Sequence, residues 1–175
     1  MGRLDRDLNP TRILWATMTT SERPMTFDLD RFVDAQSQVY DDVLEELRRG
    51  RKTGHWIWFI FPQIAGLGRS ATSERFSVAS LDEARAYLAH PLLGARLHEC
   101  VAALLAIDGG TADEVLGPLD AMKLRSSMTL FHRAAPDDPA FVQVLERFFD
   151  GSADAATDAL LAPMASSSPS RPQLG

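Results

Sequence analysis

The sequence predicts an all-α fold with a single compact multihelical domain. Apolar residues recur every three or four positions along most of the chain, residues that start or end helices separate these stretches, and only one segment has the composition of a β-strand. With 175 residues, of which 45% are hydrophobic and 24% charged, the chain can bury one core. We expect this domain to span 25–162, between a flexible N-terminal extension (1–24), with Met25 as a translation start, and a disordered tail (163–175).

The first predicted helix spans 30–49. Its apolar residues recur at helical steps from Phe32 to Leu47, and Gly50 follows as a residue that ends helices. Gln36 projects into the same apolar stripe. A polar side chain in that position must find an internal hydrogen-bond partner or line a cavity.

Helix-capping residues locate the remaining helices. Ser80 and Glu83 have the spacing of a capping box, in which the two side chains bind free backbone N–H groups at a helix start. Thr111 and Glu114 repeat this spacing, and prolines in a first-turn position begin two other helices. The predicted segments are 81–89, 91–104, 111–117, 119–132, 138–151 and 155–161.

The strand-like exception is 55–61, His-Trp-Ile-Trp-Phe-Ile-Phe. Its aromatic and β-branched content alone favours a strand. The sequence offers no second strand to pair with it, and a lone strand would leave its backbone groups without partners. We therefore expect a helix or a compact segment buried among helices.

The composition argues against several classes of protein. No apolar run approaches the roughly 20 residues that a membrane-spanning helix needs, and the first ten residues lack the apolar core of a secretory signal. Cys100 is the single cysteine, and no Cys/His cluster has zinc spacing. We therefore expect a cytoplasmic protein with no membrane partner, no internal disulfide, no metal and no cofactor.

The first candidate site is the basic stretch 48–75. It carries a net charge of +5 in a chain of −6, so the remainder totals −11, and the local field favours an anionic ligand. Gly66 and Gly68 allow successive backbone N–H groups to turn toward an anion. Arg69 and Ser70 add side-chain donors. The alternative is a solvated basic loop whose glycines serve only the turn.

The second candidate site lies on the predicted helix 119–132. Asp120, Lys123 and Ser127 project onto its apolar half, and Ser126 adjoins them. A polar group buried there without a partner costs about 2 kcal/mol or more. These side chains therefore form either a ligand pocket or an internal hydrogen-bond network that fixes the packing of two helices.

Three residues of the strand-like segment also carry useful chemistry. His55 can act as an acid, a base or a donor near neutral pH, and the alternative is a residue that begins a helix. Trp56 and Trp58 can stack a planar ring, and the alternative for both is core filling.

Several separated motifs resemble one known family. They are Gly-Arg-Lys-x-Gly-His-Trp-Ile-Trp-Phe-Ile-Phe-Pro-Gln at 50–63, Gly-Leu-Gly at 66–68, His-Pro at 90–91, and Asp120 with Lys123, Ser126, Ser127 and Thr129. In this order they resemble a bacterial family of unknown function whose members are often labelled calpastatin, over about 27–161. The resemblance implies a small all-helical domain, which favours helix for 55–61, and it implies no established activity.

The inhibitor label does not fit the sequence. The eukaryotic calpain inhibitor is an extended, disordered chain, whereas this sequence has the pattern of a folded core. A more distant resemblance is to proteins of NAD and ADP-ribose processing, which also combine tryptophans and a lysine-bearing helix in a compact helical fold.

We hypothesise that these features meet in one cleft that binds a small phosphorylated, nucleotide-like molecule. The candidate catalytic residues are Asp120, Lys123 and His55, which would orient or protonate a glycosidic group during hydrolysis of an ADP-ribose or N-glycosidic derivative. The candidate ligand-binding residues are Gln36, Trp56, Trp58, Gln63, Gly66, Gly68, Arg69, Ser70, Ser126 and Ser127. The alternative is a non-catalytic helical interaction module that contacts an acidic protein or RNA, although the charge of −6 argues against broad nucleic-acid binding.

Overall fold

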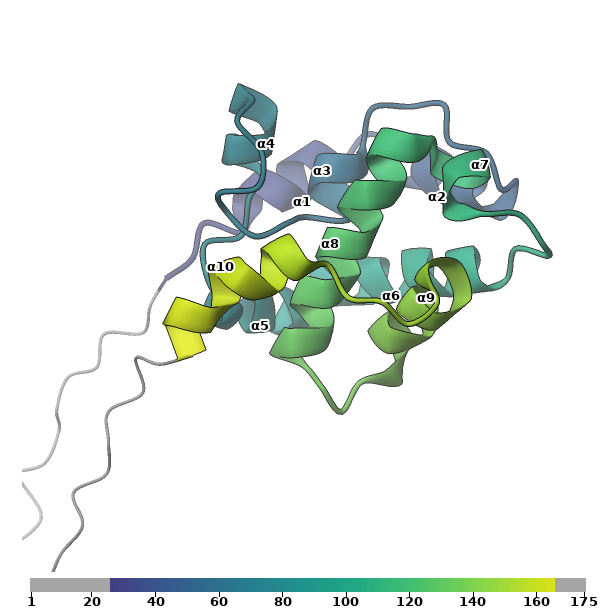
Figure 1. Cartoon of the computed structure of the whole chain (residues 1–175). Coiled ribbons are helices and arrows are strands. Elements are labelled where there is room, and N and C mark those ends of the chain that lie inside the picture. The colour runs from purple at the N-terminus through teal and green to yellow at the C-terminus, as the bar shows by residue number, and fades with distance from the viewer. Residues whose placement is uncertain (1–25, 166–175) are drawn as a thin grey trace, which may run out of the picture.

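A computed structural model describes residues 26–165 (Figure 1). The helices in this part of the chain are α1 (Asp30–Gln36), α2 (Tyr40–Arg48), α3 (Ile57–Ile60), α4 (Ala71–Arg75), α5 (Leu81–Ala89), α6 (Leu93–Leu105), α7 (Ala112–Leu116), α8 (Pro118–Ala134), α9 (Pro139–Phe149) and α10 (Ala155–Ala165). These residues contain no strand, and Ile64 and Val78 form an isolated bridge. The prediction of one compact all-α domain is confirmed.

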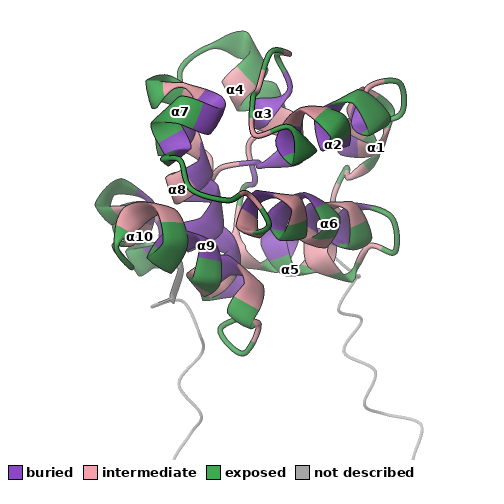
Figure 2. Cartoon of the chain, turned by 90° about the vertical axis from the view of Figure 1, so that its right-hand side faces the viewer, coloured by how far each residue is buried: buried purple, intermediate pink, exposed green. Residues whose placement is uncertain are grey.

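Helix α8 is the central element of the fold. It packs against α5, α7, α9 and α10, and residues 126–131 are all buried. Figure 2 shows these buried residues of α8 in the middle of the molecule. The rings of Tyr87, Phe131 and Phe141 continue the core from α5 across α8 to α9, with neighbouring ring centroids 5.4 and 5.6 Å apart. Side chains at the start of α8 therefore project from a rigid support.

The predicted helix 30–49 is two helices, so the prediction of a continuous helix is wrong. Helix α1 ends at Gln36 and α2 begins at Tyr40, and the turn between them contains neither glycine nor proline. The Gln36 side-chain amide donates hydrogen bonds to the Phe59 carbonyl (2.8 Å) and to the Tyr87 hydroxyl (3.1 Å). These long-range contacts favour the break.

The aromatic segment 55–61 forms a single helical turn, α3. Ile57 and Ile60 face the core, and Trp56 and Phe61 on either side of the turn are also buried. The aromatic content therefore serves packing, and the expectation of a compact segment among helices is met. Helix α4 was not predicted, because a five-residue helix shows little periodicity.

The predicted capping boxes differ in the structure. Thr111 and Glu114 form a complete box at the start of α7. Ser80 caps α5 by accepting a hydrogen bond from the Glu83 N–H, but the Glu83 carboxylate pairs with Arg31 at 2.8 Å and does not complete the box. One oxygen of the Glu83 carboxylate binds Arg31, and the other accepts a hydrogen bond from the Ala79 N–H (2.7 Å).

The ends of the domain differ partly from expectation. Helix α10 runs to Ala165, which is three residues beyond the expected boundary at 162. The expected extension 1–24 and the tail beyond residue 165 lie outside the described residues.

Candidate functional site

A cavity of about 470 Å³ lies where the segment around α3 and α4 meets the first turns of α8 and α10. Its volume is within the range of small-molecule sites, about 300 to 1,000 Å³. The lining residues are Trp58, Gln63, Leu67, Gly68, Arg69, Ser70, Ser73, Leu119, Met122, Lys123, Arg125, Ser126, Asp154 and Ala156.

Three cations and one carboxylate belong to this lining. Arg69 is exposed and has no ion-pair or hydrogen-bond partner among the described residues. Arg125 donates to the carbonyls of Ser152 (2.9 Å) and Ala153 (3.0 Å), and it forms no ion pair with a carboxylate within residues 26–165. With Lys123 as the third cation and a single acidic side chain in the lining, the cavity favours an anionic ligand.

The first turn of α8 brings apolar side chains to the same cavity. Gly117, with φ of 85°, turns the chain, and Pro118 begins the helix. Leu119 and Met122 are 75% and 67% exposed and both line the cavity. Large exposed apolar side chains beside cations favour a ligand that has both an apolar and an anionic part.

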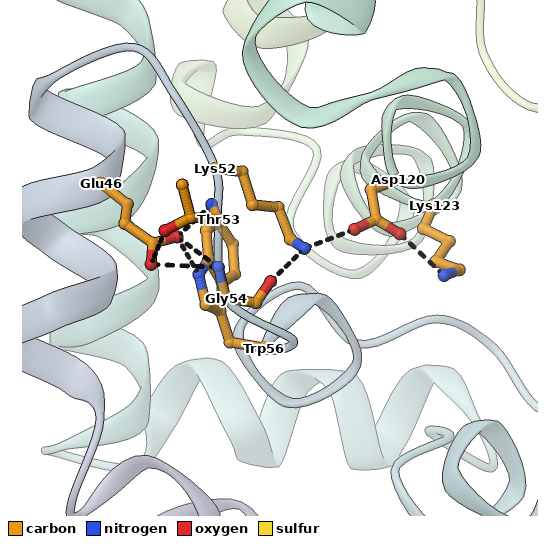
Figure 3. A network of polar contacts seen from close by, with 7 residues as sticks. All are labelled: Glu46, Lys52, Thr53, Gly54, Trp56, Asp120 and Lys123. Carbon is orange, nitrogen blue, oxygen red and sulfur yellow. Dashed lines mark hydrogen bonds and ion pairs between the residues drawn. The ribbon is translucent and has the colours of Figure 1, made fainter.

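Two lysines converge on the carboxylate of Asp120 (Figure 3). Lys52 Nζ lies 2.7 Å from Asp120 Oδ2, and Lys123 Nζ lies 2.8 Å from Asp120 Oδ1. Burial alone would raise the pKa of Asp120, but the hydrogen bonds from Lys123 and Lys52 outweigh this effect and lower the pKa. Asp120 is therefore ionised near neutral pH, with both oxygens engaged.

Each ammonium group also lies over a tryptophan ring. Lys123 Nζ is 4.2 Å from the centroid of the Trp58 ring, and Lys52 Nζ is 5.1 Å from the centroid of the Trp56 ring. Both distances are typical of cation–π interactions. Lys123 lines the cavity, whereas Lys52 does not, and the side chain of Lys52 is only 8% exposed.

Glu46 of α2 fixes the loop that carries Lys52 (Figure 3). Its carboxylate accepts hydrogen bonds from the backbone N–H groups of Thr53 and Gly54, from the Thr53 hydroxyl and from the Trp56 indole, at distances of 2.7 to 3.0 Å. Burial would raise the pKa of Glu46, but these hydrogen bonds lower it from 4.5 to about 2. The loop is therefore anchored by an ionised side chain.

The structure brings about half of the predicted site residues together. The cavity lining includes Trp58, Gln63, Gly68, Arg69, Ser70, Lys123 and Ser126. It does not include Gln36, His55, Trp56, Gly66, Asp120 or Ser127. Asp120 reaches the cavity only through its ion pair with Lys123.

The residues outside the cavity have other surroundings. The Gln36 amide bonds within the core, so a single cleft that includes Gln36 is not formed. Trp56 is buried and donates to Glu46. His55 is exposed, and Ser127 is buried with no hydrogen-bond partner for its hydroxyl among the described residues.

The glycine-containing loop serves packing as well as turning. Gly66 has φ of 99° and lies against Leu160, outside the cavity lining. A Cβ atom at Gly68 would collide with the Ser73 side chain. The Ser70 hydroxyl accepts a hydrogen bond from the Ser73 N–H and so caps α4. Of the two side-chain donors expected in this loop, Arg69 is the one for which the described residues provide no partner.

Sequence reasoning missed Glu46, and it counted Lys52 only as one charge of the basic stretch 48–75. The chain contains 18 lysine and arginine residues, of which only Lys52 and Lys123 are lysines, and both bind Asp120. This rarity of lysine was a signal in the sequence that could have linked the two positions. Glu46 gave no such signal, because its contacts depend on how the loop folds back on α2.

Other kinds of site find no support in residues 26–165. No group of three or more His, Cys, Asp or Glu side chains there is arranged to hold a metal ion. Over the same residues, no helix has the length and apolar character needed to span a bilayer. Cys100 is buried, and burial raises the pKa of its thiol to about 12, which leaves it protonated near neutral pH.

Comparisons with known proteins identify relatives of the chain. The family model described as "Protein of unknown function (DUF1810)" matches residues 26–161. A solved structure, that of the conserved hypothetical protein Rv1873 from Mycobacterium tuberculosis, has 53% sequence identity to this chain and a TM-score of 0.77. That match covers 78% of this chain and 97% of the other. No curated protein matches the chain.

Proposed function

We propose that this chain, which belongs to the DUF1810 family of proteins of unknown function, binds a small phosphorylated, nucleotide-like molecule in the cavity at the start of α8. The observation that carries the proposal is the composition of that cavity. It combines the cations Arg69, Lys123 and Arg125 with the exposed apolar side chains Leu119 and Met122. A nucleotide offers the matching parts, an anionic phosphate and a base with apolar faces.

The phosphate of the ligand binds at Lys123 and Arg69 in this proposal. The guanidinium group of Arg69 has no competing partner among the described residues, and its planar fork can bind two phosphate oxygens. Ser70 contributes less than the sequence suggests, because its hydroxyl already caps α4.

The ring of the ligand binds against the apolar wall of the cavity. Lys123 occupies one face of Trp58 at 4.2 Å, so a ligand ring cannot stack on that face. Leu119 and Met122 provide an alternative surface. Gln63 lines the same cavity, and its side-chain amide has no partner among the described residues, so it can bind the polar edge of a base.

Binding is better supported than hydrolysis. Asp120 is ionised and held by two lysines, so it is a poor proton donor, and His55 does not line the cavity. Asp154 is the carboxylate in the lining, and its Oδ2 accepts hydrogen bonds from the Thr157 N–H (2.8 Å) and hydroxyl (2.6 Å). Hydrolysis of an ADP-ribose or N-glycosidic derivative is therefore an activity to assay once a bound ligand is known.

A thermal-shift screen of the full chain tests the proposed binding. The compounds are inorganic phosphate, ribose 5-phosphate, adenosine, AMP, ADP-ribose and NAD. A ligand at about 100 times its Kd stabilises the folded state by about 2.7 kcal/mol, which raises the unfolding midpoint by several degrees. We expect AMP or ADP-ribose to raise the midpoint more than phosphate or adenosine, because only the former engage both parts of the cavity.

Three variants make the screen specific to the cavity. Lys123→Met and Arg69→Ala should abolish the shift. Arg51→Ala, which removes an exposed arginine outside the lining, should keep it. The absence of any shift in the unsubstituted chain, or equal shifts in all variants, would contradict the proposal.

The exposed Leu119 and Met122 favour a second candidate, a helical interaction module. Two large apolar side chains on one exposed helix face are typical of a protein contact, such as one with a second copy of the chain. Sedimentation velocity separates the two functions. An interaction face predicts a dimer that the double variant Leu119→Ser/Met122→Ser dissociates. A ligand site predicts that the double variant loses the AMP shift and keeps the oligomeric state of the unsubstituted chain.

A further inference from the structure

The two lysines of the chain share one carboxylate, whereas the other side chains that are cationic at pH 7 are arginines. An ammonium group directs three N–H donors to the corners of a tetrahedron, and a guanidinium group directs its donors within one plane. At Asp120, therefore, the protein uses the cation that can contact groups on several sides at once.

Lys52 has all of its donors engaged within the protein. Its Nζ lies 2.7 Å from Asp120 Oδ2, donates to the Gly54 carbonyl and lies over the Trp56 ring. The side chain is 8% exposed, and Glu46 holds the loop from which it projects. Lys52 therefore binds Asp120 and has no donor left for a ligand.

Lys123 has one donor that no described residue engages. Asp120 Oδ1 accepts one N–H at 2.8 Å, and the Trp58 ring covers a second side of the ammonium at 4.2 Å. The Lys123 side chain is 25% exposed and lines the cavity. The remaining N–H is therefore available to a ligand oxygen.

We infer that Lys52, Asp120 and Trp58 are positioning residues that hold the Lys123 ammonium as a single fixed donor for an anionic ligand oxygen. This inference deepens the proposed function and rests on it for the ligand, whereas the positioning already exists in the free protein. A different account is that these residues attract the anionic ligand only through a diffuse positive field. Two lysines and one carboxylate carry a net charge of +1. The two accounts predict opposite changes in anion binding for the variant Asp120→Asn.

The first experiment observes the two ammonium groups directly in the free protein. Selective ¹⁵N-lysine labelling of the full chain gives two side-chain ammonium signals, and Lys123→Met assigns them. Ammonium protons held in hydrogen bonds exchange slowly enough to be seen, and the Trp58 ring should shift the Lys123 signal upfield. Trp58→Phe should keep part of this shift, and Trp58→Leu should remove it. A missing Lys123 signal, or one unchanged in Trp58→Leu, would overturn the inference.

The second experiment separates positioning from charge by the variant Asp120→Asn. This change removes a negative charge, so a diffuse field predicts tighter binding of phosphate. Positioning predicts binding about tenfold weaker, the equivalent of one charge-assisted hydrogen bond, because Lys123 loses its anchor. Asp158→Asn is the matched control, since it removes the same charge from an exposed ion pair with Arg133 outside the cavity.

Inorganic phosphate and AMP are the probes, with the Lys123 ammonium signal as the readout. Equal or tighter binding by Asp120→Asn would overturn the positioning role of Asp120. If neither probe moves the signal in the unsubstituted chain, the proposed function fails, and the spectrum of the free protein still decides whether Lys123 is held in place. The unfolding midpoint of each variant shows whether that variant is folded. If Asp120→Asn does not fold, the Trp58 variants decide the inference.

Discussion

Glu46 stabilises the Lys52 loop with one carboxylate that accepts hydrogen bonds from Thr53, Gly54 and Trp56. The variant Glu46→Gln keeps the size of the side chain and removes its charge, which weakens several of these bonds. We expect a loss of about 1 to 3 kcal/mol in the free energy of unfolding, measured by urea denaturation. Glu45→Gln is the control, because the one side-chain contact of Glu45 within the described residues is an exposed ion pair with Arg49. This substitution should cost less than about 1 kcal/mol.

The same carboxylate predicts a pH dependence of stability. The pKa of Glu46 is lowered from 4.5 in the unfolded chain to about 2 in the folded protein, so the unfolded state binds the proton more readily. Its contribution to stability is complete above pH 4.5 and is lost as the pH falls toward 2. The difference in unfolding free energy between the unsubstituted chain and Glu46→Gln should therefore shrink in that window. A difference that stays constant with pH would refute this role.

His98 predicts a pH dependence of the opposite sign. Burial would lower its pKa, but the hydrogen bonds to Asp138 (2.7 Å) and to the Gly94 carbonyl (2.7 Å) outweigh burial and raise it above 6.5. A raised pKa means that the contribution to stability is complete below pH 6.5 and is lost as the pH rises through the folded-state pKa. The unfolding midpoint should fall over this range, and His98→Gln should remove that part of the fall. Because His98 is 41% exposed, the effect is screened and modest.

At the scale of elements, the contact between α5 and α6 depends on Gly94. A Cβ atom at this position would collide with the carbonyl oxygen of Leu88 at the end of α5. Helix propensity alone predicts that Gly94→Ala stabilises α6 by about 1 kcal/mol. The packing predicts the reverse, a loss of about 2 kcal/mol or more, measured as the free energy of unfolding. A stabilised Gly94→Ala variant would show that the two helices can move apart without cost.

The helices that could be predicted are those with local signals. Helix α5 coincides with the predicted segment 81–89. The capping box of α7 and the proline at the start of α9 were also predicted correctly. The break between α1 and α2 could not be predicted, because the contacts of Gln36 with Phe59 and Tyr87 come from distant parts of the chain. Short elements such as α4 show too few residues for a period to emerge.

At the scale of the whole molecule, charge and helical projection were enough to predict part of the cavity lining. Arg69 and Lys123 were singled out by charge and by helical projection, and both line the cavity. Helical projection predicts which face of a helix a residue lies on, but not which element packs against that face. Asp120 was therefore predicted to contact the ligand, although it lies outside the cavity lining and pairs with Lys123. The pairing of Lys52 with Asp120 was not predicted, because the approach of the Lys52 loop to α8 is a tertiary contact.

Titration calorimetry with AMP is the most direct measurement of whether the cavity at the start of α8 is a ligand site. The unsubstituted full chain should bind AMP at one site, and Lys123→Met should weaken binding by at least about tenfold, because it removes a charged donor. Arg51→Ala should bind like the unsubstituted chain. AMP binding that is undiminished in Lys123→Met, or the absence of saturable binding in the unsubstituted chain, would contradict the assignment of this cavity.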